Sequence, residues 1–245
     1  MYLIRKGRSH MDFVGKFKVF WELFIVRDGW VRVITVGLVN TLLIAVLGLL
    51  IGIVIGTLIA AVKVMPKYKR WVRILDRICT VYVGFFRGTP LVVQLLITYY
   101  VMWPMMGIAV SSLNTAIIVF GLNSGAYVSE IMRGGILSVD HGQMEAGRAV
   151  GLSYGTTMKE IVIPQAVKNI LPTLGNEFIA LIKDTSVVSF VAATDLYKTF
   201  TEIGNVRYEY FMPYLCMALV YIILVLLISW GIKIMERSLR KSDRN

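Results

Sequence analysis

Glu145–Pro164 reads EAGRAVGLSYGTTMKEIVIP, a polar, small-residue segment between two long apolar blocks that is too hydrophilic to cross a bilayer. Asp140 can cap a first helix, and Gly151 can adopt the left-handed conformation that ends it. Ser153 can cap a second helix, which Pro164 is expected to stop. The stretch therefore predicts a helical hairpin that projects from the membrane.

The whole hairpin covers about residues 140–164. Its first helix carries little side-chain bulk. Ala146, Gly147 and Ala149 would let the surface of another protein approach the backbone closely. A cytoplasmic loop without a partner would have the same composition, so composition alone leaves both interpretations open.

The spacing within the hairpin favours a partner. Glu145–Gly147 reads E-A-G, Gly151 follows six residues after Glu145, and Ile161–Pro164 reads I-V-I-P. This pattern resembles the EAA loop of importer-type ABC transporter permeases, which runs E-A-A, three residues, G, nine residues, I-x-L-P. The chain departs from it at Gly147, in place of the second alanine, and at Ile163, in place of the leucine.

Six further short motifs occur in order: Arg87–Leu91 (RGTPL), Asn123–Tyr127 (NSGAY), Glu130 with Arg133–Ile136 (RGGI), Leu171-Pro172, Gly175–Glu177 (GNE) and Lys183–Ser186 (KDTS). They are similar to motifs of the permeases for polar amino acids, the histidine, glutamine, glutamate, arginine and opine group. The resemblance covers residues 33–237. It implies an ABC importer permease fold in a bacterial cytoplasmic (inner) membrane.

The composition excludes an ordinary soluble domain, because 57% of the 245 residues are hydrophobic, 17% are charged and the mean hydropathy is +0.70. We expect an all-α, polytopic membrane protein. Its net charge of +11 fits the positive-inside rule, since segments on the hairpin side hold 17 Lys and Arg residues against 9 on the other side. A cytoplasmic hairpin then places the N-terminus outside and the C-terminus in the cytoplasm.

The apolar blocks predict five transmembrane helices within a permease domain of residues 33–237. An N-terminal tail with an interfacial amphipathic helix (1–32) precedes this domain, and a cytoplasmic basic tail (238–245) follows it. The expected spans are 33–62, about 78–103 ended by Pro104, 111–136, 165–192 and about 210–235.

The first 32 residues carry two expectations. Residues 1–10 lack the apolar core of a cleavable signal, and Met11 is an alternative start. From Asp12 to Arg27, phenylalanines and Trp21 fall on one helical face, which favours a helix lying in the membrane interface over a disordered tail.

Two features of the first and second spans indicate packing. Gly48, Gly52 and Gly56 recur every four residues and would let another helix approach closely. In the second span Pro90 breaks the backbone hydrogen-bond ladder, and Arg87 is expected to pair with a carboxylate or a lipid headgroup.

Polar residues in the third and fourth spans are candidates for a substrate pathway. Asn123, Tyr127 and Glu130 share one face of the third span, where helix–helix hydrogen bonding is an equal alternative for Asn123. In the fourth span an internal ion pair, of Lys183 with Glu177 or with Asp184 of a second subunit, is the alternative to a pathway. The fourth-span candidates are Asn176, Glu177, Lys183, Asp184, Thr185 and Ser186.

The chain shows no G-x-x-x-x-G-K-[ST] loop, no catalytic motif and no metal-ligand spacing, so we expect no enzyme activity and no cofactor in it. Cys79 and Cys216 are expected to be packed thiols. Any uphill transport must draw its energy from a partner or from ion coupling. A self-contained ion-coupled transporter or channel that uses buried carboxylates is the main alternative function, and a membrane-embedded enzyme is a third.

The resemblance implies the partners: two ABC ATPase subunits that hold ATP and Mg²⁺, a second permease copy or a homologous permease, and an extracellular solute-binding protein. The coupling residues that it implies are Glu145, Ala146, Gly147, Gly151, Ile161 and Pro164. The carboxylate of Glu177 favours a cationic or neutral amino acid over an acidic one, because every amino acid carries an α-ammonium group.

Overall fold

The computed structural model describes residues 12–241, so the expectations for residues 1–10 and for Met11 lie outside the described part. These residues form helices and no strand, which confirms the all-α class. The α-helices are α2 (Phe13–Trp21), α3 (Gly29–Arg32), α4 (Val39–Val64), α5 (Arg70–Gly88), α6 (Leu91–Ile97), α7 (Trp103–Met105), α8 (Ser112–Leu137), α9 (His141–Ala149), α10 (Tyr154–Thr157), α11 (Ile163–Asp184), α12 (Leu196–Arg207) and α13 (Phe211–Lys241). Among them lie π-helical turns η1 (Glu22–Val26), η2 (Val33–Leu38), η3 (Thr98–Met102) and η4 (Met158–Val162), and the 3-10 helix η5 (Thr185–Val191).

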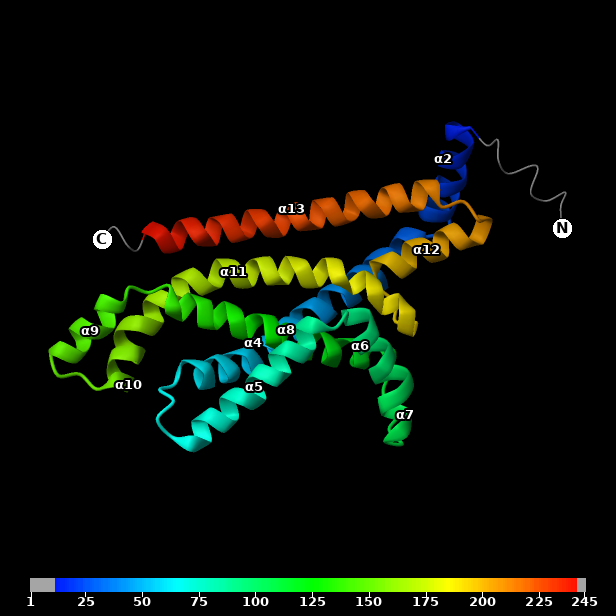
Figure 1. Ribbon diagram of the computed structural model, residues 1–245. Coiled ribbons are helices and arrows are strands. Elements are labelled where there is room, and N and C mark those ends of the chain that lie inside the picture. The colour runs from blue at the N-terminus through cyan, green and yellow to red at the C-terminus, as the bar shows by residue number, and fades with distance from the viewer. Residues whose placement is uncertain (1–11, 242–245) are drawn as a thin grey trace.

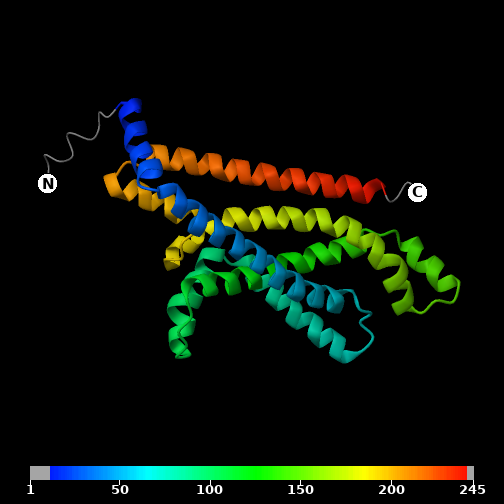
Figure 2. The same cartoon turned by 180° about the vertical axis from the view of Figure 1, so that it is seen from behind.

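The long helices lie side by side in an elongated bundle, with α11 between α13 and α8 (Figure 1). The α9–α10 hairpin lies at one end, and α2 and α12 lie at the other. The reverse view in Figure 2 shows the same arrangement, and α13 ends on the side of the hairpin. The main core cluster, which includes Leu95, Phe120 and Ile182, joins α6, α8 and α11.

The first span runs as one helical segment from Gly29 to Val64, longer than expected. It begins at Gly29 because Asp28, with φ 55°, is left-handed and separates it from the preceding helix. The glycine stripe packs on α8 as expected: a Cβ at Gly52 would lie 2.7 Å from Ser124 Oγ, and one at Gly56 would lie 2.7 Å from Val128 Cγ1.

The N-terminal helix is confirmed over Phe13–Val26, where Asp12 Oδ1 accepts a hydrogen bond from Gly15 N at 2.9 Å. Part of its aromatic face packs inside the protein, because the Phe24 ring stacks on that of Phe200 in α12. Other aromatic side chains, such as Phe13, are exposed. Interfacial placement of this helix stays a prediction.

The second span is not the single helix that the sequence predicts. The α5–α6 pair bends by 102° at Thr89-Pro90, where both residues are extended. The second helical arm also continues past the expected end at Pro104, to Met105.

Three described helices are long and apolar enough to cross a membrane, namely Gly29–Val64, Ser112–Leu137 and Phe211–Leu239, and the bent pair would be a fourth. The polar residues of α11 keep it out of this set. A count of five spans therefore stays a prediction.

Pro164 does not stop the second hairpin helix, contrary to expectation. The chain stays helical from Tyr154 to Asp184, and Pro164 lies in the first turn of α11. Just before it, Ile163 N–H bonds to Met158 O, the wider i to i−5 spacing of a π-helical turn. That turn accommodates the missing proline N–H, so α10, η4 and α11 form one unbroken helical segment, which changes direction where α10 and η4 lead into α11 (Figure 2).

Candidate functional site: a membrane hairpin joined to a polar helix face

The first hairpin helix begins where the sequence predicts. Asp140 Oδ1 accepts a hydrogen bond from Gly142 N at 2.6 Å and so caps α9. Ser153 Oγ accepts one from Thr156 N at 3.1 Å and caps α10. Each cap satisfies an N–H group that would otherwise lack a partner at a helix start.

A Schellman turn ends α9. Gly151 has φ +90°, Leu152 N donates to Gly147 O at 3.1 Å, and Gly151 N donates to Arg148 O at 3.1 Å. This pair of bonds defines the motif and favours glycine at its left-handed position. The expected left-handed conformation of Gly151 at the end of α9 is therefore confirmed, and the turn fixes the angle between the two hairpin helices. Its part in coupling to the ATPase stays a prediction.

Gly147 contributes differently from what we expected. It is buried inside the hairpin, where an added Cβ would overlap Thr157 Cγ2 of α10. It lets the two helices of this hairpin approach each other. The residues on either side of it in the sequence, rather than Gly147 itself, form the outer surface. The exposed residues of α9 and its turn include Glu145, Ala146 and Ala149.

The outer hairpin surface is small, partly apolar and solvent-accessible. Val150 is 78% exposed, next to exposed Ala149 and Gly151. Because Ala149 and Gly151 carry little side-chain bulk, another protein surface could approach the backbone closely here. Ile161 is half-buried beneath α9, and Pro164 is exposed on α11.

Glu177 joins α11 to α8. Its Oε1 accepts a hydrogen bond from Ser124 Oγ at 3.0 Å, and the side chain is half-buried. The ion pairs of the described residues do not include the Lys183–Glu177 pair that we considered within one chain. Glu177 is therefore held by a neutral hydroxyl at the α8 contact.

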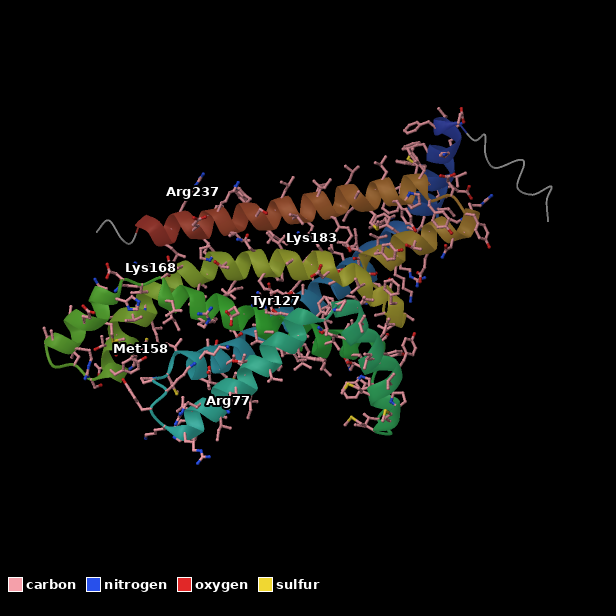
Figure 3. The ribbon with its side chains drawn as sticks, in the orientation of Figure 1. Arg77, Tyr127, Met158, Lys168, Lys183 and Arg237 are labelled. Carbon is pink, nitrogen blue, oxygen red and sulfur yellow. The ribbon has the colours of Figure 1, made fainter. Side chains whose placement is uncertain are left out.

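Asn176, Lys183 and Asp184 lie on an open side of α11, where all three are exposed. Lys183 on α11 and Tyr127 on α8 are labelled in Figure 3, in a part of the bundle away from the hairpin. Thr185 and Ser186 turn back onto the backbone at the end of α11, with Thr185 Oγ1 donating to Ile182 O at 2.8 Å and Ser186 Oγ to Lys183 O at 3.1 Å.

Asn123 braces the bend between α5 and α6. Its Nδ2 donates to Phe86 O at 3.2 Å and to Gln94 Oε1 at 3.1 Å. Gln94 Nε2 also donates to Phe86 O at 2.9 Å, and Thr89 Oγ1 donates to Phe85 O at 2.8 Å. These side chains satisfy carbonyl groups that the broken helix leaves open. The geometry thus favours the helix–helix alternative for Asn123.

Arg87 contacts an aromatic ring, and the ion pairs of the described residues do not include one between it and a carboxylate. Its guanidinium carbon lies 5.3 Å from the centroid of the Tyr127 ring, a cation–π contact between α5 and α8. The nearby Glu130 carboxylate accepts hydrogen bonds from Arg133 on its own helix, at 2.8 and 3.1 Å. Tyr127 therefore meets a cation on the face that we assigned to the pathway.

Sequence reasoning did not single out Gln94, Ser124 or Thr157. A glutamine four residues after Pro90 in an apolar block is a signal that could have identified Gln94. Ser124 belongs to the NSGAY motif but was given no role of its own, and Thr157 has no such signal, because their importance depends on contacts with distant Glu177 and with Gly147. Residues 12–241 hold no cluster of His, Cys, Asp and Glu side chains that could bind a metal.

A helical membrane bundle with a structured hairpin at one end, continuous with a helix that carries an open polar face, is the architecture of a solute permease. A family model described as "Binding-protein-dependent transport system inner membrane component" matches residues 52–241. The chain belongs to this family. It is therefore a multi-pass inner-membrane permease that works with a solute-binding protein and with a separate ATPase subunit, and it is not itself the enzyme.

Similar proteins include several amino acid permeases. The arginine transport system permease protein ArtQ of Bacillus subtilis is 37% identical over 84% of this chain and 92% of its own length. A putative glutamine transport system permease protein GlnP of Rickettsia bellii is 41% identical over 89% of this chain and 98% of its own length. These matches support the importer permease over the ion-coupled carrier.

Solved structures agree with the fold. A chain in the "Crystal structure of an amino acid ABC transporter with histidines" aligns with a TM-score of 0.79 and 35% identity, over 94% of this chain and 100% of that one. A chain of the MetNI methionine ABC transporter in an inward-facing conformation aligns with a TM-score of 0.67 and 19% identity, over 88% and 95% of the two chains.

Proposed function

We propose that this permease forms the translocation path for a polar L-amino acid, cationic or neutral, in an ATP-driven uptake system. The observation that carries the proposal is the continuous helix from Tyr154 to Asp184. One end of it belongs to the hairpin, and the other carries Asn176 and Glu177. A displacement of the hairpin can therefore be transmitted to the polar face through an unbroken helical segment.

The hairpin is the coupling element in this proposal. The exposed surface around Ala146, Ala149 and Val150 docks in a groove of a cytosolic ATPase subunit. ATP can drive the cycle only if the ATPase contacts the permease differently in its inward-open and outward-open states. The Schellman turn and both caps keep the hairpin stiff enough to carry that difference.

The open side of α11 points to a second permease chain. Lys183 and Asp184 are exposed there, although both lie on a helix within the bundle. A second copy or a homologous permease would enclose this face, and two ATPase subunits would serve the pair. The polar groups would then line a solvated path, which lowers the cost of charged groups at membrane depth.

The substrate class follows from Glu177 together with the relatives. A half-buried carboxylate attracts a cation and repels an acidic side chain. The names of similar proteins specify arginine and glutamine, one cationic and one neutral. For orientation, the positive-inside bias and the shared end of the hairpin and α13 support an outside N-terminus and a cytoplasmic C-terminus.

Uptake into proteoliposomes that hold the permease, its ATPase and its binding protein tests this function. We expect ATP-dependent uptake of arginine, histidine or glutamine in preference to glutamate. Glu177→Gln should change the affinity or the preference, while Asp76→Asn, on α5 beside Lys67, should change neither. Uptake that persists without ATP and follows an ion gradient would overturn the proposal. An unchanged preference in Glu177→Gln would remove Glu177 from the path.

A further inference from the structure

A cavity of about 440 Å³ lies where α4 ends, and none of the residues proposed for the translocation path lines it. The last two turns of α4, Met132 and Ile136 of α8, and the helical segment that begins at Tyr154 form its walls. Figure 3 labels Met158, one of the wall residues, at the hairpin end of the bundle. The cavity therefore separates the first span from the segment proposed to move during coupling.

The depth and chemistry of the cavity suit an acyl chain. Val64 is both a wall residue and the last residue of α4, so the cavity lies at the level where the first span leaves the hydrocarbon. The wall surface is almost entirely apolar, and Met65, Met132 and Met158 can adapt to an irregular hydrocarbon. A polar solute would find few partners here.

The surroundings of the cavity are cationic. Lys159 lines it, and the chain that leaves it at Met65 continues through Lys67, Lys69 and Arg70. Of these, Lys67 is paired with Asp76, with Nζ 2.6 Å from Oδ2, so Lys69 and Arg70 are the cations of this segment offered to a headgroup. Lys159 Nζ lies 3.3 Å from Glu160 Oε1, but both side chains are largely exposed, so this pair holds the lysine weakly. Cations around an apolar space at the membrane surface are typical of sites for anionic lipid.

Two exposed aromatic residues beside these cations support the same depth. Tyr68 and Trp71 are exposed on the segment after Met65. Tyrosine and tryptophan concentrate at the level of lipid headgroups. An aliphatic cavity below an aromatic and cationic rim matches the two parts of a phospholipid.

We propose that this cavity binds one acyl chain of an anionic phospholipid of the cytoplasmic leaflet, with the headgroup on Lys159 and the basic segment after Met65. The choice of leaflet rests on the proposed orientation, whereas the cavity and its cations are independent of the substrate. Tyr154 Oη donates to Val64 O at 3.5 Å across the same space. The lipid would thus pack against this hydrogen bond between α10 and α4, and it would influence the distance between α4 and the hairpin.

Native mass spectrometry of the purified permease–ATPase complex, equilibrated with phosphatidylglycerol and phosphatidylcholine, tests the proposal. We expect the wild type to retain one phosphatidylglycerol per permease chain in preference to phosphatidylcholine. Ala61→Trp places an indole in the cavity and should abolish this retention. Leu58→Trp, on the exposed side of the same helix, is the matched control and should retain the lipid.

A surface variant keeps the test valid if the tryptophan disturbs folding. Lys159→Gln should lower the preference for phosphatidylglycerol roughly fivefold, the effect of one cation worth about 1 kcal/mol near an anionic headgroup. Equal retention of the two lipids by the wild type would overturn the proposal, as would unchanged retention in Ala61→Trp. A photo-crosslinker at Ala61 that captures a permease or ATPase chain instead of lipid would also overturn it. Lipid retention is measured without any transport assay. A negative result for lipid binding would therefore not count against the proposed transport function.

Discussion

Gly147 of α9 lies directly against Thr157 of α10, and a Cβ on Gly147 would overlap Thr157 Cγ2 and lie 3.0 Å from Thr157 Oγ1. Thr157 cannot move aside freely, because its Oγ1 donates to Ser153 O at 3.0 Å. The two hairpin helices therefore meet at a point where only glycine fits. This contact holds α9 closely against α10, which continues into α11.

Gly147→Ala should loosen the hairpin. The added methyl group costs about 1–3 kcal/mol of local stability through overpacking, partly offset by the better helix propensity of alanine. Thr157→Ser in the same chain removes Cγ2, keeps the hydroxyl and should restore most of the loss. Hydrogen exchange of the α9 amides measures the effect. Equal protection in the wild type and in Gly147→Ala would contradict the packing described here.

Gly151→Ala should strain the turn, because the left-handed conformation at φ +90° costs a residue with a Cβ about 1–2 kcal/mol. Space is not the cause, since nothing lies within 4 Å of an added Cβ. We expect weaker association with the ATPase and reduced ATP-driven uptake. Gly155→Ala in α10, where the nearest atom is 4.0 Å away, is the control and should behave like the wild type.

Asn123→Leu separates a structural role from a pathway role. The change leaves Gln94 Oε1 without its donor inside the bundle, which should cost about 1–3 kcal/mol and lower the thermal unfolding temperature in detergent. If Asn123 only braces the bend, the apparent KM for substrate should stay near that of the wild type in the folded fraction. A large change in KM with an unchanged unfolding temperature would restore Asn123 to the path.

The buried carboxyl of Asp195 should make the stability of the folded protein depend on pH. Its side chain is fully buried at the start of α12, where Oδ1 accepts a hydrogen bond from Lys198 N at 2.9 Å. Burial raises the pKa of this carboxyl from 3.8 to about 6, although the backbone N–H groups act in the opposite direction. The folded state thus prefers the neutral acid. The contribution of the Asp195 carboxyl to the stability of the folded state is complete below pH 3.8 and is lost as the pH rises through 6.

Asp195→Asn removes this titration and keeps an oxygen that can cap α12. At pH 7.5 the variant should be more stable than the wild type by up to about 3 kcal/mol, and the difference should shrink as the pH falls below 6. Thermal unfolding in detergent at pH 7.5 and pH 5 gives the comparison. A stability difference that is the same at both values would show that Asp195 does not titrate in this range.

The parts of the fold that depend on neighbouring residues could be predicted from the sequence. Asp140, Ser153 and Gly151 act within three or four residues of their own positions, so capping and turn rules place them correctly. The glycine stripe of α4 was also interpreted correctly, because helix spacing alone shows that its members share a face.

The parts that depend on distant contacts could not be predicted. The helix continues past Pro164 because a π-helical turn accommodates the missing N–H group. No local sequence pattern predicts that turn. The α5–α6 bend is held by Asn123, 37 residues from the carbonyl that it caps. Gly147 and Thr157 form a pair only once the hairpin has closed, so small size at Gly147 was assigned to an external partner.

Photo-crosslinking in the assembled transporter shows whether the hairpin is the surface on which the ATPase acts. A photoreactive residue replaces Ala146, exposed on α9, or Val206, exposed on α12 at the opposite end of the bundle. We expect the probe at Ala146 to capture the ATPase and the probe at Val206 to leave it free. Capture of the ATPase from Val206, with none from Ala146 in a complex that still transports, would contradict both the coupling role of the hairpin and the proposed orientation.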